Sequence, residues 1–294
     1  MSFIGVDIGG TNVRVGLVDN LKIRKLKSFR TPKELKVFLS NLLFEIDNVV
    51  GSEVEGIGIG IPGVVDPFKR KILSCPNISF LDNFPLAKLI EKRFKKEVFI
   101  ENDVNIAALA EMYTREEKYK NIITLYIGTG IGGAIIIERK LYQGSRGGVM
   151  EIGHIIVKKD GPLCVCGNKG CIETFVSGFG LSRMWEEFFR EKLRGEEIFE
   201  LYRRGNDKAN KVVTQFLSYL NILILNLANI FSSDIIVIGG GIKEEIRPFI
   251  NEIKLYLHNW GRNYKHNPFP IEISNLSEPG VIGSSLLPIH LHMY

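Results

Sequence analysis

The sequence lacks the features that mark membrane and secreted proteins. Among its 294 residues, no apolar run reaches the length that spans a bilayer. The N-terminal residues enter a strand pattern at once, so we expect no signal peptide. Only four cysteines are present, and three of them lie within eight residues. That spacing suits a metal site in a reducing compartment better than a disulfide framework. We therefore expect a cytoplasmic protein that has no membrane partner.

The sequence also lacks a concentrated charge of one sign. The net charge is +5, charged residues make up 24% and hydrophobic residues 45%, which is typical of a globular protein. The densest basic run, at positions 92–96, falls on an amphipathic helical pattern. We expect it to be a solvated face, and we expect no nucleic-acid partner. The length allows two domains or one large one.

Four potential metal ligands lie close together in the middle of the chain. Cys164, Cys166 and Cys171 follow His154, with glycines between and beside them. Three thiolates and one imidazole are a usual donor set for a closed, tetrahedral structural zinc site. The alternative is a loop of three cysteines without a metal. We predict a structural zinc, because a catalytic zinc keeps one position open.

Two carboxylates border this zinc loop, and a structural zinc needs neither of them. Glu151 lies three residues before His154, and Glu173 lies two residues after Cys171. A metal that fixes the two ligands would also orient both glutamates. We hypothesise that they line a polar pocket for sugar hydroxyls. The alternative is two ordinary solvated glutamates.

Two glycine-rich turns each join two predicted strands. The first turn is Asp7–Thr11 and the second is Gly128–Gly133, after a strand at 122–127 and before the β-branched run at 134–137. In a dinucleotide-binding fold the glycine turn leads into a helix, so a nicotinamide oxidoreductase is disfavoured. Exposed N–H groups of such turns can bind phosphate, and Asp7 can hold Mg²⁺ directly or through water. A plain β-turn is the alternative.

A third set of signals marks strand-to-helix junctions and helix ends. Asp103 lies where a strand at 98–100 passes into a helix, a place where functional groups of α/β sheets gather, although it could simply cap the helix. Thr31 and Pro32 predict the start of a helix over 32–47. A helix is also expected over 243–257. We expect His290 and His292 to be tail residues rather than ligands.

In their order along the chain, these motifs resemble the ROK family of sugar kinases, and bacterial and archaeal glucokinases most of all. The resemblance covers essentially the whole chain. It rests on Asp7–Thr11, Pro62–Asp66, Glu101–Asn105, Gly128–Gly133, Glu151–His154, Cys164–Glu173 and Gly239–Gly241.

The sequence departs from the family pattern in three places. Val149 and Met150 stand where many members have Ala-Gly, and Asn12 stands where lysine is common. The first strand begins at about residue 3, so we expect no N-terminal helix-turn-helix of the kind found in the family's repressor branch.

The resemblance implies an α/β chain with an actin-like (ribonuclease H-like) ATPase fold, in two lobes with an interdomain cleft. Residues 1–103 would form the small lobe, with a closing helix at about 280–294 packing back on it. Residues 104–279 would form the large lobe, which carries the zinc loop. A homodimer or homotetramer is expected.

The resemblance also implies site residues and an activity, the ATP-dependent phosphorylation of a hexose, first of all at the 6-OH of glucose. Asp103 would be the general base. The sugar-binding residues would be Gly63, Asn77, Asn102, Asp103, Glu151, His154 and Glu173. The residues binding ATP with Mg²⁺ would be Asp7, Gly9, Gly10, Thr11, Asn12, Gly128, Thr129, Gly130, Gly132, Gly133, Gly239, Gly240 and Gly241. Fructose, mannose or an N-acetylated amino sugar is an alternative substrate, and a non-catalytic sugar-sensing regulator is an alternative function.

Overall fold

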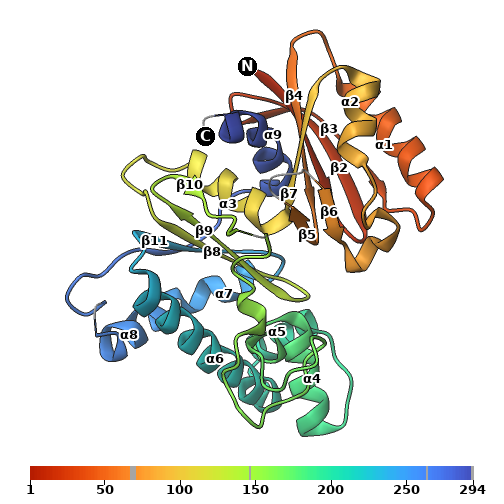
Figure 1. The fold of residues 1–294 in the computed structure, drawn as a ribbon. Helices are drawn as coiled ribbons and strands as arrows, with labels where there is room; N and C mark the ends of the chain where they lie inside the picture. Colours follow the sequence, from red (N-terminus) through yellow and green to blue (C-terminus); the bar gives the residue numbers. More distant parts are fainter. Residues whose placement is uncertain (67–70, 146, 263, 293–294) are drawn as a thin grey trace. The chain divides into compact units, whose positions relative to one another are not determined.

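Two compact units make up the chain in the computed structural model, which describes residues 1–66, 71–145, 147–262 and 264–292 (Figure 1). The first unit consists of Met1–Lys120, Ala134–Val149 and Leu276–Tyr294, and the second of Asn121–Gly133 and Met150–Asn275. The small lobe expected from the sequence falls wholly within the first unit.

The first unit is built on a five-stranded sheet with the order β3-β2-β1-β4-β7. The strands are β1 (Ser2–Ile8), β2 (Asn12–Asp19), β3 (Lys22–Arg30), β4 (Val54–Ile61) and β7 (Glu97–Asn102). The first three form an antiparallel meander, and β1, β4 and β7 run parallel. Two short antiparallel strands, β5 (Val64–Asp66) and β6 (Lys71–Ser74), form a separate pair. Because β1, β4 and β7 run parallel, their carboxyl ends meet at one edge of the five-stranded sheet.

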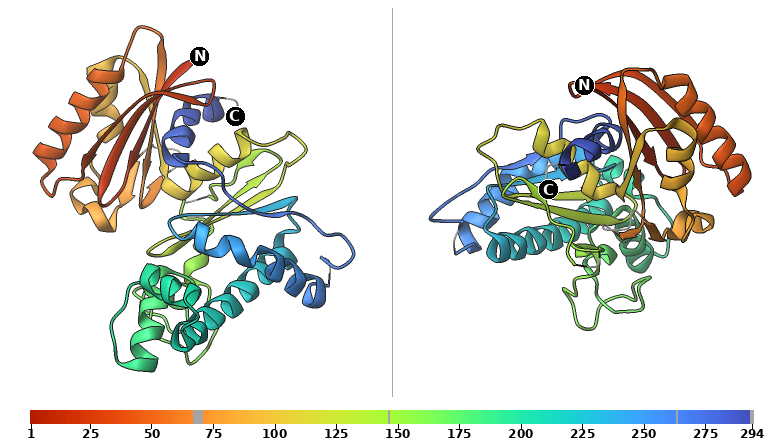
Figure 2. Two further views of the ribbon diagram at one scale, coloured as in Figure 1. Left: turned by 180° about the vertical axis from the view of Figure 1, so that it is seen from behind. Right: turned by 45° about the horizontal axis from the view of Figure 1, so that its top comes forward.

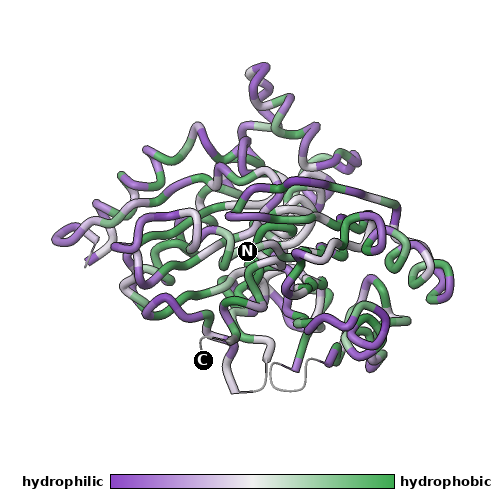
Figure 3. The backbone as a smooth tube through the Cα atoms, turned by 90° about the horizontal axis from the view of Figure 1, so that it is seen from above, coloured by the Kyte–Doolittle hydropathy of each residue, from purple (hydrophilic) through white to green (hydrophobic). Residues whose placement is uncertain are grey.

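Helices cover both faces of this sheet. On one face lie α1 (Leu35–Val49) and α2 (Leu86–Phe94), and on the other lies α9 (Pro279–His292), which also packs against α3 (Asp103–Tyr113) (Figure 2). Figure 3 shows polar and apolar residues alternating along outer helices, as expected where one helical face is buried. Gly58 allows α9 close approach, since a Cβ there would lie 1.7 Å from the carbonyl oxygen of Ser284.

The second sheet has the order β10-β9-β8-β11-β12. Its strands are β8 (Ile122–Ile127), β9 (Ile131–Ile137), β10 (Lys140–Leu141), β11 (Ile235–Gly239) and β12 (Ile271–Ile273). Strand β11 runs parallel to β8 and β12, and nearly all residues of these three strands are buried. As the β-branched run predicts, a strand and not a helix follows the second glycine turn.

Three helices of the second unit pack together: α4 (Gly178–Phe189), α5 (Gly195–Arg203) and α6 (Asp207–Phe231). By length and composition alone α6 could cross a membrane, but half of its most apolar window is buried inside the protein. The core helix of a globular protein has the same properties. Its buried residues, such as Phe216, Leu220 and Leu227, recur at helical spacing.

Two helix predictions are wrong in detail. The first helix begins at Leu35 with Glu34 as its N-cap, so Thr31 and Pro32 do not start it. The helix expected over 243–257 is instead α7 (Lys243–Ile246) and α8 (Ile250–Trp260), separated by a 3-10 turn at Arg247–Phe249. That turn contains Pro248, whose missing N–H and fixed φ interrupt an α-helix.

Candidate functional site

The carboxyl edge of the first sheet gathers polar residues from β1 and β7, which lie on either side of β4. Asp7 is the penultimate residue of β1 and pairs in register with Gly60 of β4, which pairs in turn with Glu101 of β7. Asn102 ends β7, and Asp103 is the first residue of α3. Functional groups of α/β sheets collect at such strand ends, as the sequence predicts for Asp103.

Asn102, and not Asp103, is the N-cap of α3. Its side-chain oxygen accepts hydrogen bonds from the N–H groups of Val104 at 2.9 Å and Asn105 at 3.2 Å. Its side-chain amide donates to the carbonyl oxygen of Gly63 at 3.0 Å. Asp103 Oδ1 accepts a hydrogen bond from the neighbouring Val104 N–H at 2.9 Å. The carboxylate of Asp103 is thus held at the helix start without serving as its cap.

Asp103 has a pKa that suits proton transfer near neutral pH. Burial raises it most, and the charge of Asp7 raises it further, from 3.8 to about 7. Hydrogen bonds from Val104 and Asn102 act in the opposite direction. A carboxylate with a pKa near the operating pH is a good general base, because it is both available and basic enough to take a proton.

Asp7 also has a raised pKa, but the positively charged side chain of Arg14 lies beside it. Burial raises the pKa to about 6, the nearby Arg14 lowers it, and Glu278 raises it. Arg14 lies 3.6 Å from Asp7 and 3.3 Å from Glu278 between charged atoms. Two buried or half-buried carboxylates, Asp7 and Asp103, therefore interact at one strand edge. A divalent cation there would relieve the repulsion between them.

Thr31 fixes the first glycine turn, although the sequence pattern predicts that it starts a helix. The N–H of Gly9 donates to the carbonyl oxygen of Asn12 at 2.9 Å, which closes the β1–β2 hairpin. Thr31 donates from its hydroxyl to the Gly9 carbonyl at 2.6 Å and from its N–H to the Thr11 carbonyl at 2.9 Å. Thr31 thus stabilises the hairpin. Its sequence neighbours do not predict this role, because its partner Gly9 is 22 residues away along the chain.

The exposed tip of this hairpin lies against a predicted sugar-binding residue. Gly10 and Thr11 are exposed, and a Cβ added at Gly10 would lie 3.2 Å from the Cβ of Asn77. Asn77 belongs to the 3-10 turn at Pro76–Leu81. The structure therefore brings Asp7, Gly10, Asn77, Gly63, Asn102 and Asp103 to one edge of the first unit.

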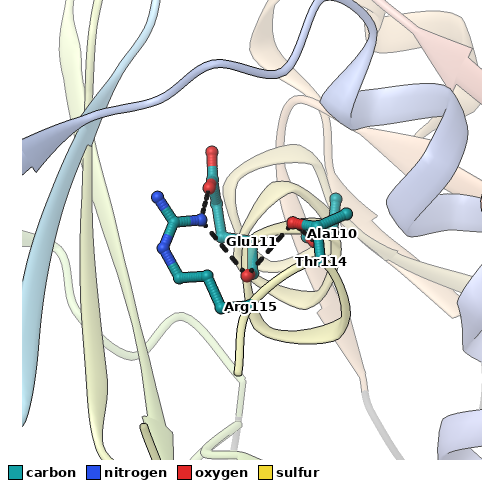
Figure 4. A network of polar contacts seen from close by, with 4 residues as sticks. All are labelled: Ala110, Glu111, Thr114 and Arg115. Atoms are coloured by element: carbon teal, nitrogen blue, oxygen red, sulfur yellow. Dashed lines mark hydrogen bonds and ion pairs between the residues drawn. The ribbon is translucent and has the colours of Figure 1, made fainter. Parts of the chain in front are cut away.

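The helix that begins at Asp103 is also tied at its far end (Figure 4). Glu111 is fully buried and forms an ion pair with Arg115, one turn on, whose side chain is 13% exposed. The Thr114 hydroxyl donates to the Ala110 carbonyl at 2.7 Å, and Arg115 donates to the Glu111 carbonyl at 3.3 Å. These contacts hold the last turn of α3 closed.

In the second unit, the second glycine turn is held by the start of α4. The N–H groups of Gly178 and Phe179 donate to the carbonyl oxygens of Gly128 at 2.8 Å and Thr129 at 3.0 Å. The Gly239–Gly241 segment follows β11, which pairs with β8, and a Cβ at Gly128 would lie 3.7 Å from the Gly241 nitrogen. Two backbone turns that can approach a ligand closely thus lie side by side.

Glu173 contacts the second glycine turn. Its Oε2 accepts from the N–H of Ile131 at 3.3 Å, and a Cβ at Gly130 would lie 2.6 Å from the same oxygen. Glu173 belongs to a short 3-10 turn directly after Cys171. The carboxylate is therefore positioned by the cysteine loop on one side and the glycine turn on the other.

The four predicted zinc ligands converge. The ligand atoms of His154, Cys164, Cys166 and Cys171 all lie within 4.8 Å of one another. His154 Nδ1 and Cys164 Sγ are 3.6 Å apart, as are the Sγ atoms of Cys166 and Cys171. A tetrahedral zinc with bonds of about 2.3 Å to sulfur and 2.0 Å to nitrogen gives separations of roughly 3.8 Å for sulfur pairs and 3.5 Å for sulfur and nitrogen. The donor set therefore fits a tetrahedral zinc.

The chain turns that shape this loop are those glycine permits. Gly167 and Gly170 have φ of +90° and +71°. The Gly167 N–H donates to the Cys164 carbonyl at 2.9 Å, which closes the turn between two of the cysteines. His154 ends a 3-10 turn that follows Glu151, whose side chain is exposed. Glu151 thus directly precedes the short turn that carries the ligand His154.

Other functional features escaped the sequence patterns. Glu101, only 4% exposed, accepts from the Asn102 N–H at 2.7 Å and from the Asn105 side-chain amide at 2.9 Å, and Gln143 also donates to it. His290 is not a tail residue: it is 2% exposed, and its Nε2 accepts from the Leu141 N–H at 3.2 Å. His292 lies outside the residues whose side chains are described. The Gln143–Glu101 and Leu141–His290 contacts each join residues far apart in sequence.

A profile of the ROK family matches residues 3–290. The chain belongs to the ROK family. It is 32% identical over 258 residues to the N-acetyl-D-glucosamine kinase of Haemophilus influenzae, covering 82% of this chain and 84% of that one. It is 31% identical over 263 residues to the glucokinase of Thermotoga maritima, with 82% of each chain covered.

Solved structures agree on the fold. The ROK hexokinase of Thermus thermophilus superposes with a TM-score of 0.87 at 28% identity, over 100% of both chains. The ROK family glucokinase of Streptomyces griseus, in complex with glucose and AMPPNP, superposes with a TM-score of 0.81 at 29% identity, over 98% of this chain and 99% of that one. The expected α/β, actin-like ATPase fold is confirmed.

Proposed function

We propose that this chain is an ATP-dependent sugar kinase that transfers the γ-phosphoryl group to a hexose hydroxyl, in the first instance the 6-OH of glucose. The observation that carries the proposal is Asp103, a half-buried carboxylate at the start of α3 with a pKa raised to about 7. It stands beside Asp7 and the exposed glycine hairpin. Kinases need such a base next to a phosphate-binding turn.

In the proposed reaction, the sugar hydroxyl attacks the γ-phosphorus as Asp103 accepts its proton. A bond forms between the hydroxyl oxygen and phosphorus, and the bond from phosphorus to the β–γ bridging oxygen breaks. The products are the sugar phosphate, ADP and protonated Asp103, which returns its proton to solvent. Most of the acceleration comes from positioning and charge neutralisation. Mg²⁺ bound with ATP would supply positive charge, and Asp7 would hold it directly or through water.

Backbone groups of the glycine turns would bind the nucleotide. The supporting features are the exposed Gly10 and Thr11 of the first turn and the closely spaced turns at Gly128–Gly133 and Gly239–Gly241. N–H groups in such turns hydrogen-bond phosphate oxygens without a side chain between them. Gly9 and Asn12 complete the first turn, and Gly132 completes the second.

The sugar would be held by amides and carboxylates. Asn77, Asn102 and Gly63 lie at the strand edge beside Asp103, and we assign Glu151, His154 and Glu173 a role in sugar binding as well. Zinc would keep those three residues in place, since a structural metal contributes folding energy to its loop. His154 would then serve both as a zinc ligand and as a wall of the sugar site.

Two alternatives remain within the same framework. Another hexose could be the substrate, since a similar chain of this family is named an N-acetyl-D-glucosamine kinase. A sugar-sensing regulator without catalysis is the second alternative, and the environment of Asp103 speaks against it. A cytoplasmic location and a homodimer or homotetramer stay predictions.

The test is one ADP-release assay with a panel of sugars: glucose, mannose, fructose, N-acetylglucosamine and N-acetylmannosamine. We expect sugar-dependent ADP release, greatest with glucose. Greatest turnover with an acetylated sugar would retain the kinase and replace its substrate. Sugar binding without any ADP release would contradict the proposal and favour the regulator.

A further inference from the structure

Glu101 is a buried carboxylate that the proposed chemistry does not use. It is the residue two positions before Asp103, and its side chain is 4% exposed. Burial raises its pKa, while hydrogen bonds from Asn102, Asn105 and Gln143 lower it. All three donors found in the described part of the chain are uncharged amides. A buried carboxylate depends on such donors, because each unmet oxygen is costly.

The two oxygens of Glu101 have different partners. Oε1 accepts from the Asn102 N–H at 2.7 Å and from the Asn105 side-chain amide at 2.9 Å. These two residues flank Asp103 and Val104, so Oε1 acts as a clip across the strand end and the first turn of α3. Oε2 accepts from the side-chain amide of Gln143. Gln143 thus completes the set of bonds around the carboxylate that holds the turn.

Gln143 is itself held in place by the rest of the first unit. It follows β10 by two residues, and the Leu141 N–H of β10 donates to His290 of α9 at 3.2 Å. Burial first, and then the charge of Arg139, lower the pKa of His290 to about 4, so the ring is neutral and can accept this bond. Helix α9 therefore fixes β10, and β10 brings Gln143 to Glu101.

We propose that Gln143 is a positioning residue for Asp103, acting through Glu101. This inference rests on the proposed kinase function. Without the Gln143 amide, one oxygen of Glu101 loses its donor, and the carboxylate gains a proton or moves to find another partner. Either change loosens the clip on Asn102 and Asn105 and displaces Asp103 from the attacking hydroxyl. Small misplacements of a reacting group lower turnover strongly.

The test compares Gln143→Leu and Gln143→Glu with the wild type. Gln143→Leu should lower kcat by roughly 10- to 100-fold, the scale of an unmet buried hydrogen bond, while KM for ATP changes little. Gln143→Glu sets two carboxyl groups against each other, and their repulsion is relieved when they share one proton. The ratio of its kcat to the wild-type kcat should therefore rise as the pH falls from 8 to 6. The ratio removes the part of the pH dependence that the two proteins share.

Two further variants keep the test specific. The exchange Glu101→Gln with Gln143→Glu restores one amide facing one carboxylate, and it should recover at least tenfold of the kcat lost in Gln143→Glu. Gln215→Glu makes the same chemical change at the only other glutamine, in α6 of the second unit. It should leave kcat and the pH ratio unchanged.

Amide hydrogen exchange provides a readout that needs no activity. The Asn102 N–H should exchange faster in Gln143→Leu than in the wild type. Wild-type kcat in Gln143→Leu, a flat pH ratio in Gln143→Glu, or unchanged Asn102 exchange would each overturn the inference. A wild-type protein that phosphorylates no sugar would refute the proposed function instead, and Asn102 exchange would still decide whether Gln143 holds the turn.

Discussion

The side-chain amide of Asn102 donates to the carbonyl oxygen of Gly63 at 3.0 Å, while its oxygen caps α3. One side chain thus joins the end of β7, the start of α3 and the turn after β4. Asp103 is the next residue in the sequence, so the contacts of the Asn102 side chain also fix the position of the Asp103 carboxylate.

Asn102→Asp and Asn102→Ala should separate the two tasks of this side chain. Aspartate caps a helix as well as asparagine, so Asn102→Asp should retain the cap but lose the donor to Gly63. Its added negative charge should raise the pKa of Asp103 and move the acid limb of kcat/KM to higher pH. Asn102→Ala should lower the free energy of unfolding by about 1–3 kcal/mol, through the lost cap and the unmet Gly63 carbonyl. Urea unfolding and a pH–rate profile measure both; an unmoved acid limb in Asn102→Asp would count against the account.

Asp103→Asn should lower turnover strongly and stabilise the fold. Turnover should fall by roughly 10²–10⁴, the usual contribution of a general base, while sugar binding persists. The pKa of Asp103 is raised from 3.8 to about 7, so above pH 7 the folded protein carries a buried charge that the unfolded chain carries in water. Its ionisation therefore destabilises the fold as the pH rises from about 4 through 7.

The stability of Asp103→Asn should accordingly exceed that of the wild type by roughly 1–3 kcal/mol at pH 8, since one pKa unit corresponds to about 1.4 kcal/mol. The difference should shrink at pH 5.5, where the wild-type carboxyl is protonated. Denaturant unfolding at the two pH values measures it. An equal difference at both would show that burial of the charge is not its cause.

Gly280 and Gly283, on the same helix, should differ sharply when each is replaced by alanine. A Cβ at Gly280 would lie 2.5 Å from the Asp7 carboxylate, which can move aside, whereas a Cβ at Gly283 would lie 1.7 Å from the backbone carbonyl oxygen of Ile106, which cannot. We expect Gly280→Ala to fold and to require more Mg²⁺ for half-maximal activity, because Asp7 is displaced. Gly283→Ala should lose several kcal/mol of stability, as overpacking does. A Mg²⁺ titration and a thermal melt of both variants check this, and unchanged Mg²⁺ dependence in Gly280→Ala would contradict the role of Asp7.

Cys166→Ser should lose bound zinc and sugar affinity together. Cys166 is exposed, so the substitution removes a ligand without emptying a core position. The matched control is Cys75→Ser, because Cys75 is the one cysteine outside the ligand cluster and a serine hydroxyl can still donate to the Pro62 carbonyl. Metal analysis and sugar titration measure the outcome. A wild type purified without chelators that holds no zinc, or a Cys166→Ser variant with wild-type sugar affinity, would refute the structural role of the metal.

The parts of the fold that follow from local periodicity could be read from the sequence. Period-two alternation around Asp7–Thr11 predicts a hairpin, and the β-branched residues after Gly133 predict a strand rather than a helix. The zinc ligands were also predictable, because four ligands within 18 positions can converge without help from distant segments. The position of Asp103 at a strand end is a local feature too.

Contacts that join distant segments could not be read in this way. Thr31 looks like a helix cap, yet its hydroxyl bonds to Gly9. Gln143 reaches Glu101 across 42 positions, and His290 reaches Leu141 across 149. No local pattern encodes these pairs, because tertiary packing decides which partner a polar side chain meets. Where local and tertiary preferences compete, as at Thr31, the tertiary contact prevails.

The most direct test of the central claim is a crystal structure of the protein with a hexose and a non-hydrolysable ATP analogue. The account predicts that one sugar hydroxyl lies about 2.6–3.2 Å from the Asp103 carboxylate and in line with the terminal phosphorus. The polyphosphate should contact the N–H groups of both glycine turns. A hydroxyl far from Asp103, or a polyphosphate that meets neither Gly9–Thr11 nor Gly128–Gly133, would contradict it.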